Sequence, residues 1–211
     1  MSTPLVKICG LTNIEDTLAA IDLGADFLGF NFYAQSPRYL SYAKAKKIFD
    51  EIPPNIPKVG VFVNEAYENI IDLTQLLELD YLQFHGDESP EFCNRMGHAW
   101  WKAIRLSSEE EIEKISSYES EWILIDAYVK GQYGGTGMKP DWDLAKRAKN
   151  LNKKIFLAGG LGPENVQLAI ATLQPYAVDV ASGVEAKPGK KDLKKMEDFI
   201  NKAKSVHLRV L

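Results

Sequence analysis

Eight short apolar runs, each followed by a helical pattern, limit the folds open to this chain more than any other feature. Apolar residues fill these runs with little polar alternation, which predicts a parallel sheet covered on both faces. The runs start roughly 20 to 30 residues apart, as crossover connections between parallel strands require. The expected strands are 5–9, 27–31, 58–63, 81–84, 101–105, 122–126, 155–158 and 177–181.

The segments between these runs carry apolar residues at helical spacing. The expected helices are 14–23, 42–52, 65–77, 89–96, 108–116, 141–149, 163–173 and 192–204. Asn13 is placed to cap the first helix and Gly24 to end it. Eight strand–helix units in 211 residues predict a single-domain (β/α)8 TIM barrel over residues 1–211. The alternative is a doubly wound open sheet, but that fold usually has a glycine-rich loop after its first strand, and the glycine-rich turns here come late.

The overall composition is that of a soluble globular protein. Hydrophobic residues make up 45% of the chain and charged residues 26%, and the net charge of −4 does not indicate nucleic-acid binding. We interpret the lysine-rich stretch 187–195 as a solvated loop and helix start. No apolar stretch is long enough to cross a membrane, and we see no signal peptide. Two cysteines far apart do not form a disulfide framework, so we expect a cytoplasmic protein with reduced thiols.

Cys9 and Asp126 end the first and sixth expected strands. Catalytic groups of such barrels lie at the carboxyl ends of the strands. A thiol whose thiolate is favoured can act as a general base, and a carboxyl group held protonated can act as a general acid. Such a pair can move protons around a carbonyl or imine without a metal or cofactor. The alternatives are that Cys9 is a small buried hydrophobe and that Asp126 caps a helix or anchors a loop.

Two glycine-containing loops follow the seventh and eighth expected strands. Gly159-Gly160 precedes one helix start, and Ser182-Gly183 is placed to open a short extra helix. Glycine lets backbone N–H groups approach an anion closely, and these two loops form the usual phosphate site of the fold. We therefore predict a phosphate site between them.

Three further polar residues are candidates for the site. Arg38, in the loop after the second strand, suits a substrate carboxylate, although a solvated surface arginine is the more common case. His85 follows the fourth strand, where a structural hydrogen bond is as favoured as substrate contact. Asp179 lies in the eighth strand. No spacing of His, Cys, Asp and Glu indicates a metal site.

Six motifs together resemble the phosphoribosylanthranilate isomerase family, in its order and at its strand ends. The resemblance runs from the first strand to the last helix, which is nearly the whole chain. The motifs are Lys7-Ile8-Cys9-Gly10-Leu11-Thr12, Gly60-Val61-Phe62-Val63-Asn64, Gln83-Phe84-His85-Gly86, Asp126 with Gly134-Gly135-Thr136-Gly137, Ala158-Gly159-Gly160-Leu161, and Asp179-Val180-Ala181-Ser182-Gly183-Val184-Glu185.

The resemblance implies an isomerase of L-tryptophan biosynthesis without a cofactor. Its substrate would be N-(5-phosphoribosyl)anthranilate, and its product 1-(2-carboxyphenylamino)-1-deoxyribulose 5-phosphate, formed by an Amadori rearrangement. The family's general acid matches Asp126 and its general base matches Cys9. Arg38 matches the arginine for the anthranilate carboxylate, and Asp179 an aspartate near the substrate nitrogen or hydroxyls. The two glycine loops would hold the phosphate, and His85 is taken as a further substrate contact.

Two other functions remain as alternatives. One is another barrel isomerase or lyase that acts on a phosphorylated sugar, such as the histidine-pathway isomerase, which generally has an aspartate where Cys9 stands. A non-catalytic binder of phosphate ligands would need the glycine loops but neither Cys9 nor Asp126.

A monomer and a homodimer are both compatible with the sequence. The tail 205–211 can extend the last helix, pack under the barrel or join a subunit contact.

Overall fold

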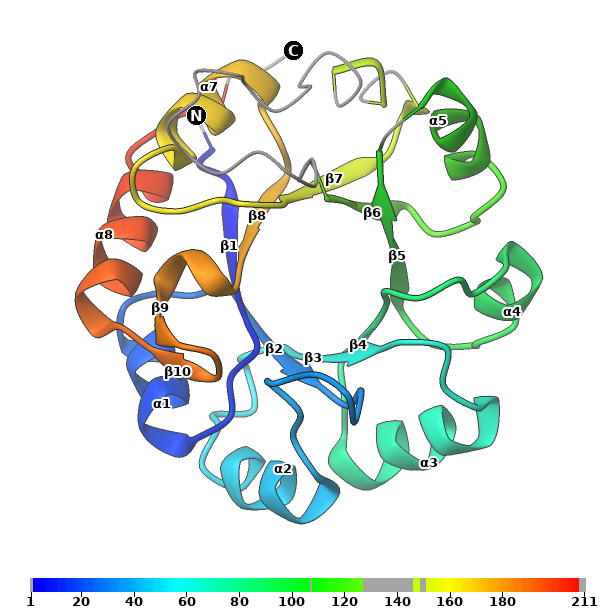
Figure 1. The fold of residues 1–211 in the computed structure, drawn as a ribbon, viewed down its shortest axis with the longest axis horizontal. Coiled ribbons are helices and arrows are strands. Elements are labelled where there is room, and N and C mark those ends of the chain that lie inside the picture. The colour runs from blue at the N-terminus through cyan, green and yellow to red at the C-terminus, as the bar shows by residue number, and fades with distance from the viewer. Residues whose placement is uncertain (1, 107, 127–145, 149–150, 209–211) are drawn as a thin grey trace.

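The computed structural model describes residues 2–106, 108–126, 146–148 and 151–208. Eight parallel strands form a closed barrel in chain order, which confirms the predicted fold (Figure 1). Pairing of the first strand with the eighth closes the ring. The strands are β1 (Leu5–Cys9), β2 (Phe27–Asn31), β3 (Lys58–Phe62), β4 (Tyr81–Phe84), β5 (Trp100–Arg105), β6 (Trp122–Asp126), β7 (Lys154–Ala158) and β8 (Ala177–Val180).

Helices surround the barrel on its outside (Figure 1). They are α1 (Ile14–Asp22), α2 (Tyr42–Phe49), α3 (Tyr67–Leu77), α4 (Pro90–Asn94), α5 (Glu109–Ile115), α7 (Val166–Leu173) and α8 (Leu193–Lys204). Asn13 caps α1 as expected, because its side-chain oxygen accepts a hydrogen bond from the Asp16 N–H at 2.9 Å. Of the expected helix 141–149, the structure describes residues 146–148, which are helical. The Gly134–Gly137 loop lies outside the described residues. No described helix has both the length and the apolar character needed to cross a membrane.

The start of α7 differs from the prediction. The helix begins at Val166 rather than at 163, because side-chain hydrogen bonds hold the preceding residues in a turn. Asn165 accepts from the Gly162 N–H and donates to the Gly160 carbonyl oxygen, both at 2.9 Å. This turn fixes the loop that follows β7.

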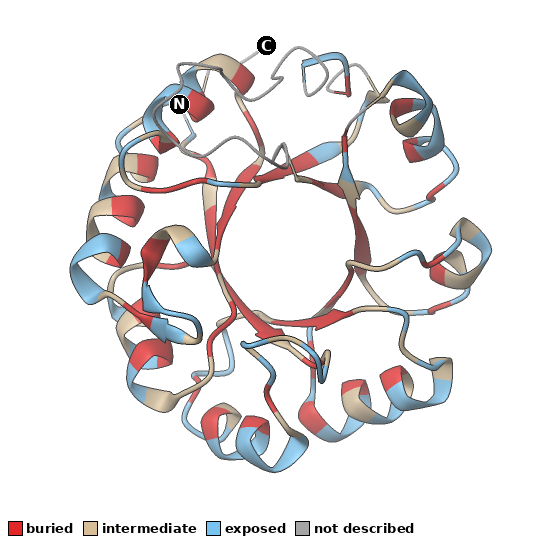
Figure 2. Ribbon diagram, in the orientation of Figure 1, coloured by how far each residue is buried: buried red, intermediate tan, exposed pale blue. Residues whose placement is uncertain are grey.

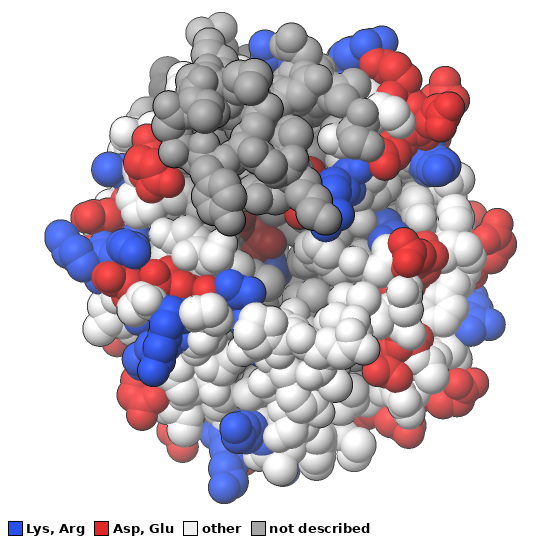
Figure 3. All heavy atoms as spheres, in the orientation of Figure 1, with Lys and Arg blue, Asp and Glu red and all other residues white. Residues whose placement is uncertain are grey.

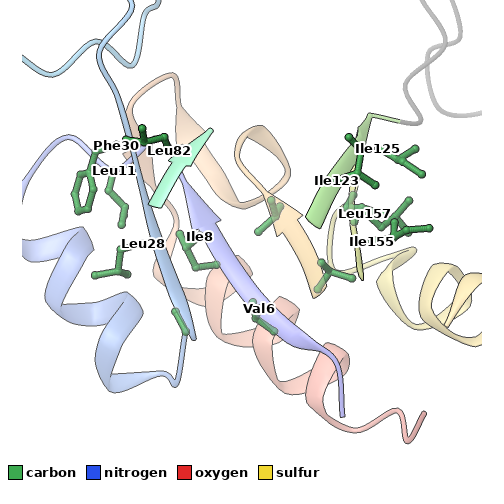
Figure 4. Packing of buried hydrophobic residues seen from close by; sticks show 14 of the residues in the cluster. Val6, Ile8, Leu11, Leu28, Phe30, Leu82, Ile123, Ile125, Ile155 and Leu157 are labelled. Atoms are coloured by element: carbon green, nitrogen blue, oxygen red, sulfur yellow. The ribbon is translucent and has the colours of Figure 1, made fainter. Parts of the chain in front are cut away.

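Each strand divides its side chains between two apolar layers. In β1, Val6 and Ile8 belong to the large cluster between barrel and helices, where Ile8 lies beside Leu28 of β2 (Figure 4). Burial follows this division, since the strands are buried along the ring and the helices are buried on one side only (Figure 2). The expectation of a sheet covered on both faces is therefore confirmed.

Aromatic residues fill much of the barrel interior. Trp101 and Phe156 stack with ring centroids 4.6 Å apart, and Phe27 packs edge-on against both rings. Such pairs contribute about 0.5–1.5 kcal/mol each beyond the burial of their area. Lys7 and Cys9 occupy later interior positions of β1, nearer the carboxyl ends of the strands, so the interior changes from aromatic to polar toward that end.

The segment after β8 leaves most of the stretch 187–195 exposed, as expected, with Lys191 as the buried exception. A short 3₁₀ helix (Ser182–Val184), which agrees with the expected extra helix, leads into a hairpin of β9 (Glu185–Lys187) and β10 (Lys190–Lys191). The Lys191 side chain is fully buried. Its Nζ donates to the carbonyl oxygens of Cys9 at 2.6 Å and Ala181 at 3.1 Å. A buried ammonium group needs such partners, and they come from two other parts of the barrel.

The described part of the C-terminal tail packs against the body of the barrel. Helix α8 ends at Lys204. Val206 and Leu208 contact the large apolar cluster, and the Leu208 N–H donates to the Ser2 carbonyl oxygen at 2.8 Å. Of the three alternatives for the tail, packing under the barrel is the one that residues 205–208 follow.

Candidate active site

A cavity of about 690 Å³ opens at the carboxyl ends of the strands. The space-filling view shows this face hollowed at its centre, with acidic and basic atoms inside the hollow (Figure 3). Eight of the nine predicted site residues line the cavity, and the ninth, Gly183, does not. The eight are Cys9, Arg38, His85, Asp126, Gly159, Gly160, Asp179 and Ser182.

Cys9 is the last residue of β1 and keeps partial contact with solvent in the cavity wall. Burial raises the pKa of its thiol, and the positive charge of Lys7 opposes that rise. Cys93 contrasts with it, because it is fully buried in α4 and burial beside Glu88 raises its pKa to about 12. Only one of the two thiols therefore faces the space where a ligand would bind.

Asp126 is the last residue of β6 and enters the same cavity from another wall. Strand β6 pairs with β5 and β7, whereas β1 pairs with β2 and β8. The thiol and the carboxyl group therefore approach a common space from strands that are not neighbours. This arrangement lets an acid and a base act on different atoms of one ligand.

The loop after β7 places two glycines where other residues would be strained. Gly159 and Gly160 have φ values of 93° and 63°, in the left-handed region. Their backbone lines the cavity together with Ser182. This part of the predicted phosphate site is therefore assembled from adjacent strand ends.

Gly183 is not among the residues that line the cavity, although its neighbour Ser182 is. A Cβ atom on Gly183 would lie 1.9 Å from the carbonyl oxygen of Leu161. Only glycine permits this close approach of the 3₁₀ helix to the loop after β7. Its position indicates packing between the two loops.

Arg38 is held by Glu185, a residue to which the sequence analysis gave no role. Its Nε and one Nη donate to the two carboxylate oxygens at 2.8 and 2.6 Å. Burial alone raises the pKa of Glu185, but Arg38 and Lys191 together lower it below its usual range. Because one edge of the guanidinium binds Glu185, the edge formed by its two terminal nitrogens is the one suited to a second carboxylate.

A hydrogen-bonded chain orients His85. The indole N–H of Trp101 donates to Gln83 Oε1 at 3.1 Å, and Gln83 Nε2 lies 3.0 Å from His85 Nδ1. An indole nitrogen can only donate, so the Gln83 amide must donate to Nδ1. We therefore assign the His85 proton to Nε2. Burial lowers the pKa of His85, which agrees with a neutral ring.

Asp179 of β8 pairs with Lys7 inside the barrel. Lys7 Nζ lies 2.9 Å from Asp179 Oδ1, and both residues are buried. The backbone register sets the two residues opposite each other on adjacent strands. Asp179 thus lines the cavity with one carboxylate oxygen already engaged.

A second cavity, of about 510 Å³, adjoins the first and shares His85 and Asp126 with it. Arg105, at the end of β5, lines this second cavity and is absent from the lining of the first. Among the residues that the structure describes, no group of three or more His, Cys, Asp and Glu side chains could hold a metal ion.

A family model and curated relatives of this chain name the same family. A sequence model of N-(5'-phosphoribosyl)anthranilate (PRA) isomerase matches residues 6–202. The N-(5'-phosphoribosyl)anthranilate isomerase of Trichlorobacter lovleyi is 45% identical over 199 residues, which cover 94% of this chain and 97% of that protein.

Solved structures agree with the sequence comparison. The phosphoribosyl anthranilate isomerase of Thermotoga maritima superposes with a TM-score of 0.89 at 43% identity, covering 96% of this chain and all of that one. Another phosphoribosyl anthranilate isomerase, in complex with reduced 1-(o-carboxyphenylamino)-1-deoxyribulose 5-phosphate, superposes with a TM-score of 0.86 at 41% identity, with coverage of 96% and 100%. The barrel, the residues at its mouth and these matches lead to one conclusion: the chain belongs to the N-(5'-phosphoribosyl)anthranilate isomerase family.

Proposed function

We propose that this protein isomerises N-(5-phosphoribosyl)anthranilate to 1-(2-carboxyphenylamino)-1-deoxyribulose 5-phosphate in L-tryptophan biosynthesis. The observation that supports this most is the shared cavity of Cys9 and Asp126, with Arg38 and the loop at Gly159-Gly160 also in its lining. A ligand with a carboxylate and a phosphate can be held at both ends in such a space. Its volume of about 690 Å³ lies in the range of small-molecule sites.

The proposed reaction begins with opening of the ribose ring. Asp126 donates a proton to the ring oxygen, the bond from that oxygen to C1 breaks, and the anthranilate nitrogen forms a Schiff base with C1. The carboxyl group is suited to this step because it enters the cavity at the end of a strand, at a wall different from that of the base.

Cys9 then removes the proton from C2 of the opened sugar. The electron pair of the C2–H bond moves toward the Schiff base and forms an enolamine, which tautomerises to the ketone. Substrate and product are isomers, so the reaction consumes no oxidant and no cofactor. A thiolate is required for the proton transfer, and its formation in a buried wall depends on nearby positive charge.

Binding at two ends positions the sugar between acid and base. The terminal edge of Arg38 binds the anthranilate carboxylate, while backbone N–H groups near Gly159, Gly160 and Ser182 bind the phosphate. Asp179 and His85 contact the middle of the substrate, His85 as a donor through Nε2. Fixing both ends lowers the entropic cost of reaching the reactive geometry.

The decisive test follows the fluorescence of anthranilate. The unstable substrate is made in place from anthranilate and phosphoribosyl pyrophosphate with the preceding transferase, and the protein is then added. We expect the signal of the substrate mixture to decay much faster than it does spontaneously, and also in the presence of EDTA. A decay no faster than the spontaneous rate would reject the proposed function.

Substitution of the two central residues tests the mechanism separately. Cys9→Ser and Asp126→Asn should each lower kcat by at least about 100-fold, as expected for loss of general acid–base catalysis, while circular dichroism remains unchanged. Cys93→Ala and Asp50→Asn are matched controls, because Cys93 is buried in α4 and Asp50 is exposed beside α2. Full activity in Cys9→Ala would refute the role of the thiol as the base.

We also propose that residues 1–211 fold as one domain that works in the cytoplasm. Pairing of β1 with β8 supports a single folding unit, since the first and last strands complete the same barrel. One cooperative unfolding transition in urea is the expected result, and two separated transitions would contradict it.

A further inference from the structure

Lys7 is a charged residue in a place where barrels usually carry apolar side chains. It is the third residue of β1, and its side chain is completely buried. An isolated ammonium group in such a place would be costly or would lose its proton. The Asp179 carboxylate at 2.9 Å supplies a countercharge. Burial alone lowers the pKa of Lys7, but Asp179 and Cys9 together raise it above its usual range, so the group stays charged.

The Lys7 ammonium group is also a neighbour of the Cys9 thiol. Residues two apart in a strand face the same side, so both side chains point into the barrel. Gly29 of β2 lies opposite Cys9 in the register. A Cβ on Gly29 would lie 2.9 Å from Cys9 Sγ and 2.9 Å from Lys7 Nζ. The two atoms therefore border the same small space, which exists because residue 29 has no side chain.

We propose that Lys7 is a positioning residue whose ammonium group stabilises the Cys9 thiolate, while Asp179 holds that ammonium in place and moderates its effect. The inference rests on the proposed role of Cys9 as the base. It gives the lysine a function beyond filling the barrel, and it gives Asp179 a function besides contact with substrate. The three residues form one charge-coupled unit across β1 and β8.

Other charged groups also lie near Cys9. The Lys191 charge adds to the effect of Lys7 on the pKa of the thiol, but it follows Lys7 in size, and the contacts of Lys191 and Arg38 are with other groups. From β10, Lys191 Nζ binds the Cys9 carbonyl oxygen, together with Ala181 and Glu185. From the loop after β2, Arg38 is paired with Glu185. His85 follows β4 and Asp126 ends β6, and neither of these strands pairs with β1. Among these groups, Lys7 is the cation that shares the barrel interior with the thiol.

The unit predicts opposite effects for its two charged partners. Burial raises the pKa of Cys9, the Lys7 charge opposes that rise, and the Asp179 charge adds to it. Lys7→Met should therefore make the thiolate harder to form. Asp179→Asn should make it easier, because the thiolate then becomes the counterion that keeps the buried Lys7 ammonium charged. If Lys7 and Asp179 only held the structure together, loss of either partner would change the reactivity of Cys9 in the same direction.

The experiment measures the alkylation of Cys9 by iodoacetamide as a function of pH, in the free protein. Mass spectrometry of the peptides separates Cys9 from Cys93. At pH 7.5 we expect Lys7→Met to slow Cys9 alkylation about tenfold, which corresponds to a rise of about one unit in its pKa. Asp179→Asn should accelerate the reaction, and the double variant should fall between the single ones.

A matched control removes another partly buried lysine. Lys153 donates to the carbonyl oxygens of Tyr118 and Ser120, away from the cavity lining. Lys153→Met should leave the alkylation profile of Cys9 unchanged. Circular dichroism identifies variants that do not fold, and Asp179→Asn tests the sign of the effect even if Lys7→Met is unstable. An unchanged profile in Lys7→Met, or slower alkylation in Asp179→Asn, would overturn the proposal.

The outcome is independent of the proposed function, because no substrate is present during alkylation. Opposite shifts in a protein without isomerase activity would support the charge unit and reject the enzyme assignment. Isomerase activity together with identical alkylation profiles in all variants would support the enzyme assignment and reject the charge unit. In an active enzyme, the acid limb of the kcat–pH profile should also move to higher pH in Lys7→Met.

Discussion

At the scale of single residues, Glu185 decides how Arg38 can be used. The carboxylate occupies the side of the guanidinium that carries Nε, and so leaves the terminal edge toward a ligand. We expect Glu185→Gln to raise KM about tenfold with a smaller change in kcat, since one charge-assisted hydrogen bond is worth about 1.5–3 kcal/mol. Steady-state kinetics measure both constants. Glu197→Gln is the control, because the Glu197 side chain is 45% exposed and pairs only with Lys194 and not with Arg38 among the ion pairs of the described residues. An unchanged KM in Glu185→Gln would contradict the role.

The tautomer of His85 is a second prediction at this scale. If Gln83 donates to Nδ1, then the imidazole proton is on Nε2. Nitrogen-15 NMR of the imidazole should show a protonated Nε2 and an unprotonated Nδ1 near pH 7. Gln83→Leu should abolish this preference and lower kcat/KM about tenfold, the cost of a lost buried hydrogen bond. Gln167→Leu on α7 should change neither, and a proton on Nδ1 in the unaltered protein would refute the assignment.

Residue types at strand ends could be predicted from sequence, but their partners could not. Cys9 and Asp126 end runs whose apolar character is visible locally, so their placement at the cavity followed from the barrel rule. Glu185 stood in a motif after the eighth strand and received no role. Its partner Arg38 is far away in the chain, and no local pattern links the two. The same reason hid the burial of Lys191.

At the scale of elements, contact between two loops shapes the proposed phosphate site. The 3₁₀ helix Ser182–Val184 approaches the loop after β7 so closely that a Cβ on Gly183 would meet the Leu161 carbonyl oxygen at 1.9 Å. Gly183→Ala must therefore move one backbone segment away from the other. We expect a higher KM for the phosphate-bearing substrate and a lower melting temperature.

Kinetics and thermal unfolding of the same variant measure the two effects. Gly97→Asn is a suitable control, because Gly97 has a φ of 57°, which asparagine tolerates, and no atom lies within 4 Å of its would-be Cβ. An unchanged KM in Gly183→Ala would show that the loops do not need this close contact to bind the substrate.

Strand positions could be predicted more closely than helix ends. Strand β6 has the predicted bounds, since a short apolar run between polar segments is a local signal. Helix α7 begins later than expected because Asn165 binds the backbone of the preceding loop. The hairpin β9–β10 was missed, since its lysines resemble a solvated stretch until Asp16 and Glu185 are seen beside them.

At the scale of the whole molecule, Asp16 joins the beginning of the barrel to its end. Its buried carboxylate in α1 accepts from Lys190 Nζ and from the Lys191 N–H, each at 2.7 Å. Burial raises the pKa of Asp16, but these hydrogen bonds outweigh it and lower the pKa below its usual range. The carboxylate therefore stabilises the fold above its ordinary pKa, and this contribution is lost as the pH falls through the lowered value.

Asp16→Asn should consequently lower the free energy of unfolding by about 2 kcal/mol at neutral pH, as for loss of a charged hydrogen bond. The difference from the unaltered protein should shrink below about pH 4, where the aspartate begins to take up protons. Urea unfolding at pH 6.5 and pH 3 measures this difference in the free energy of unfolding. Asp50→Asn, in an exposed pair, should show no such difference, and a difference for Asp16→Asn that grows at low pH would contradict the sign.

The sequence by itself determined the order of strands and helices, the closed eight-stranded barrel and the chemical types at its mouth, because apolar runs, helical periodicity and strand-end positions are local patterns. Only the tertiary structure decided which of these groups interact. Lys7 meets Asp179, Arg38 meets Glu185, and Lys191 meets the end of β1 through contacts between distant parts of the chain. Burial and the partners of a charge determine its protonation and orientation, and both arise only when the first two units of the barrel meet the last one.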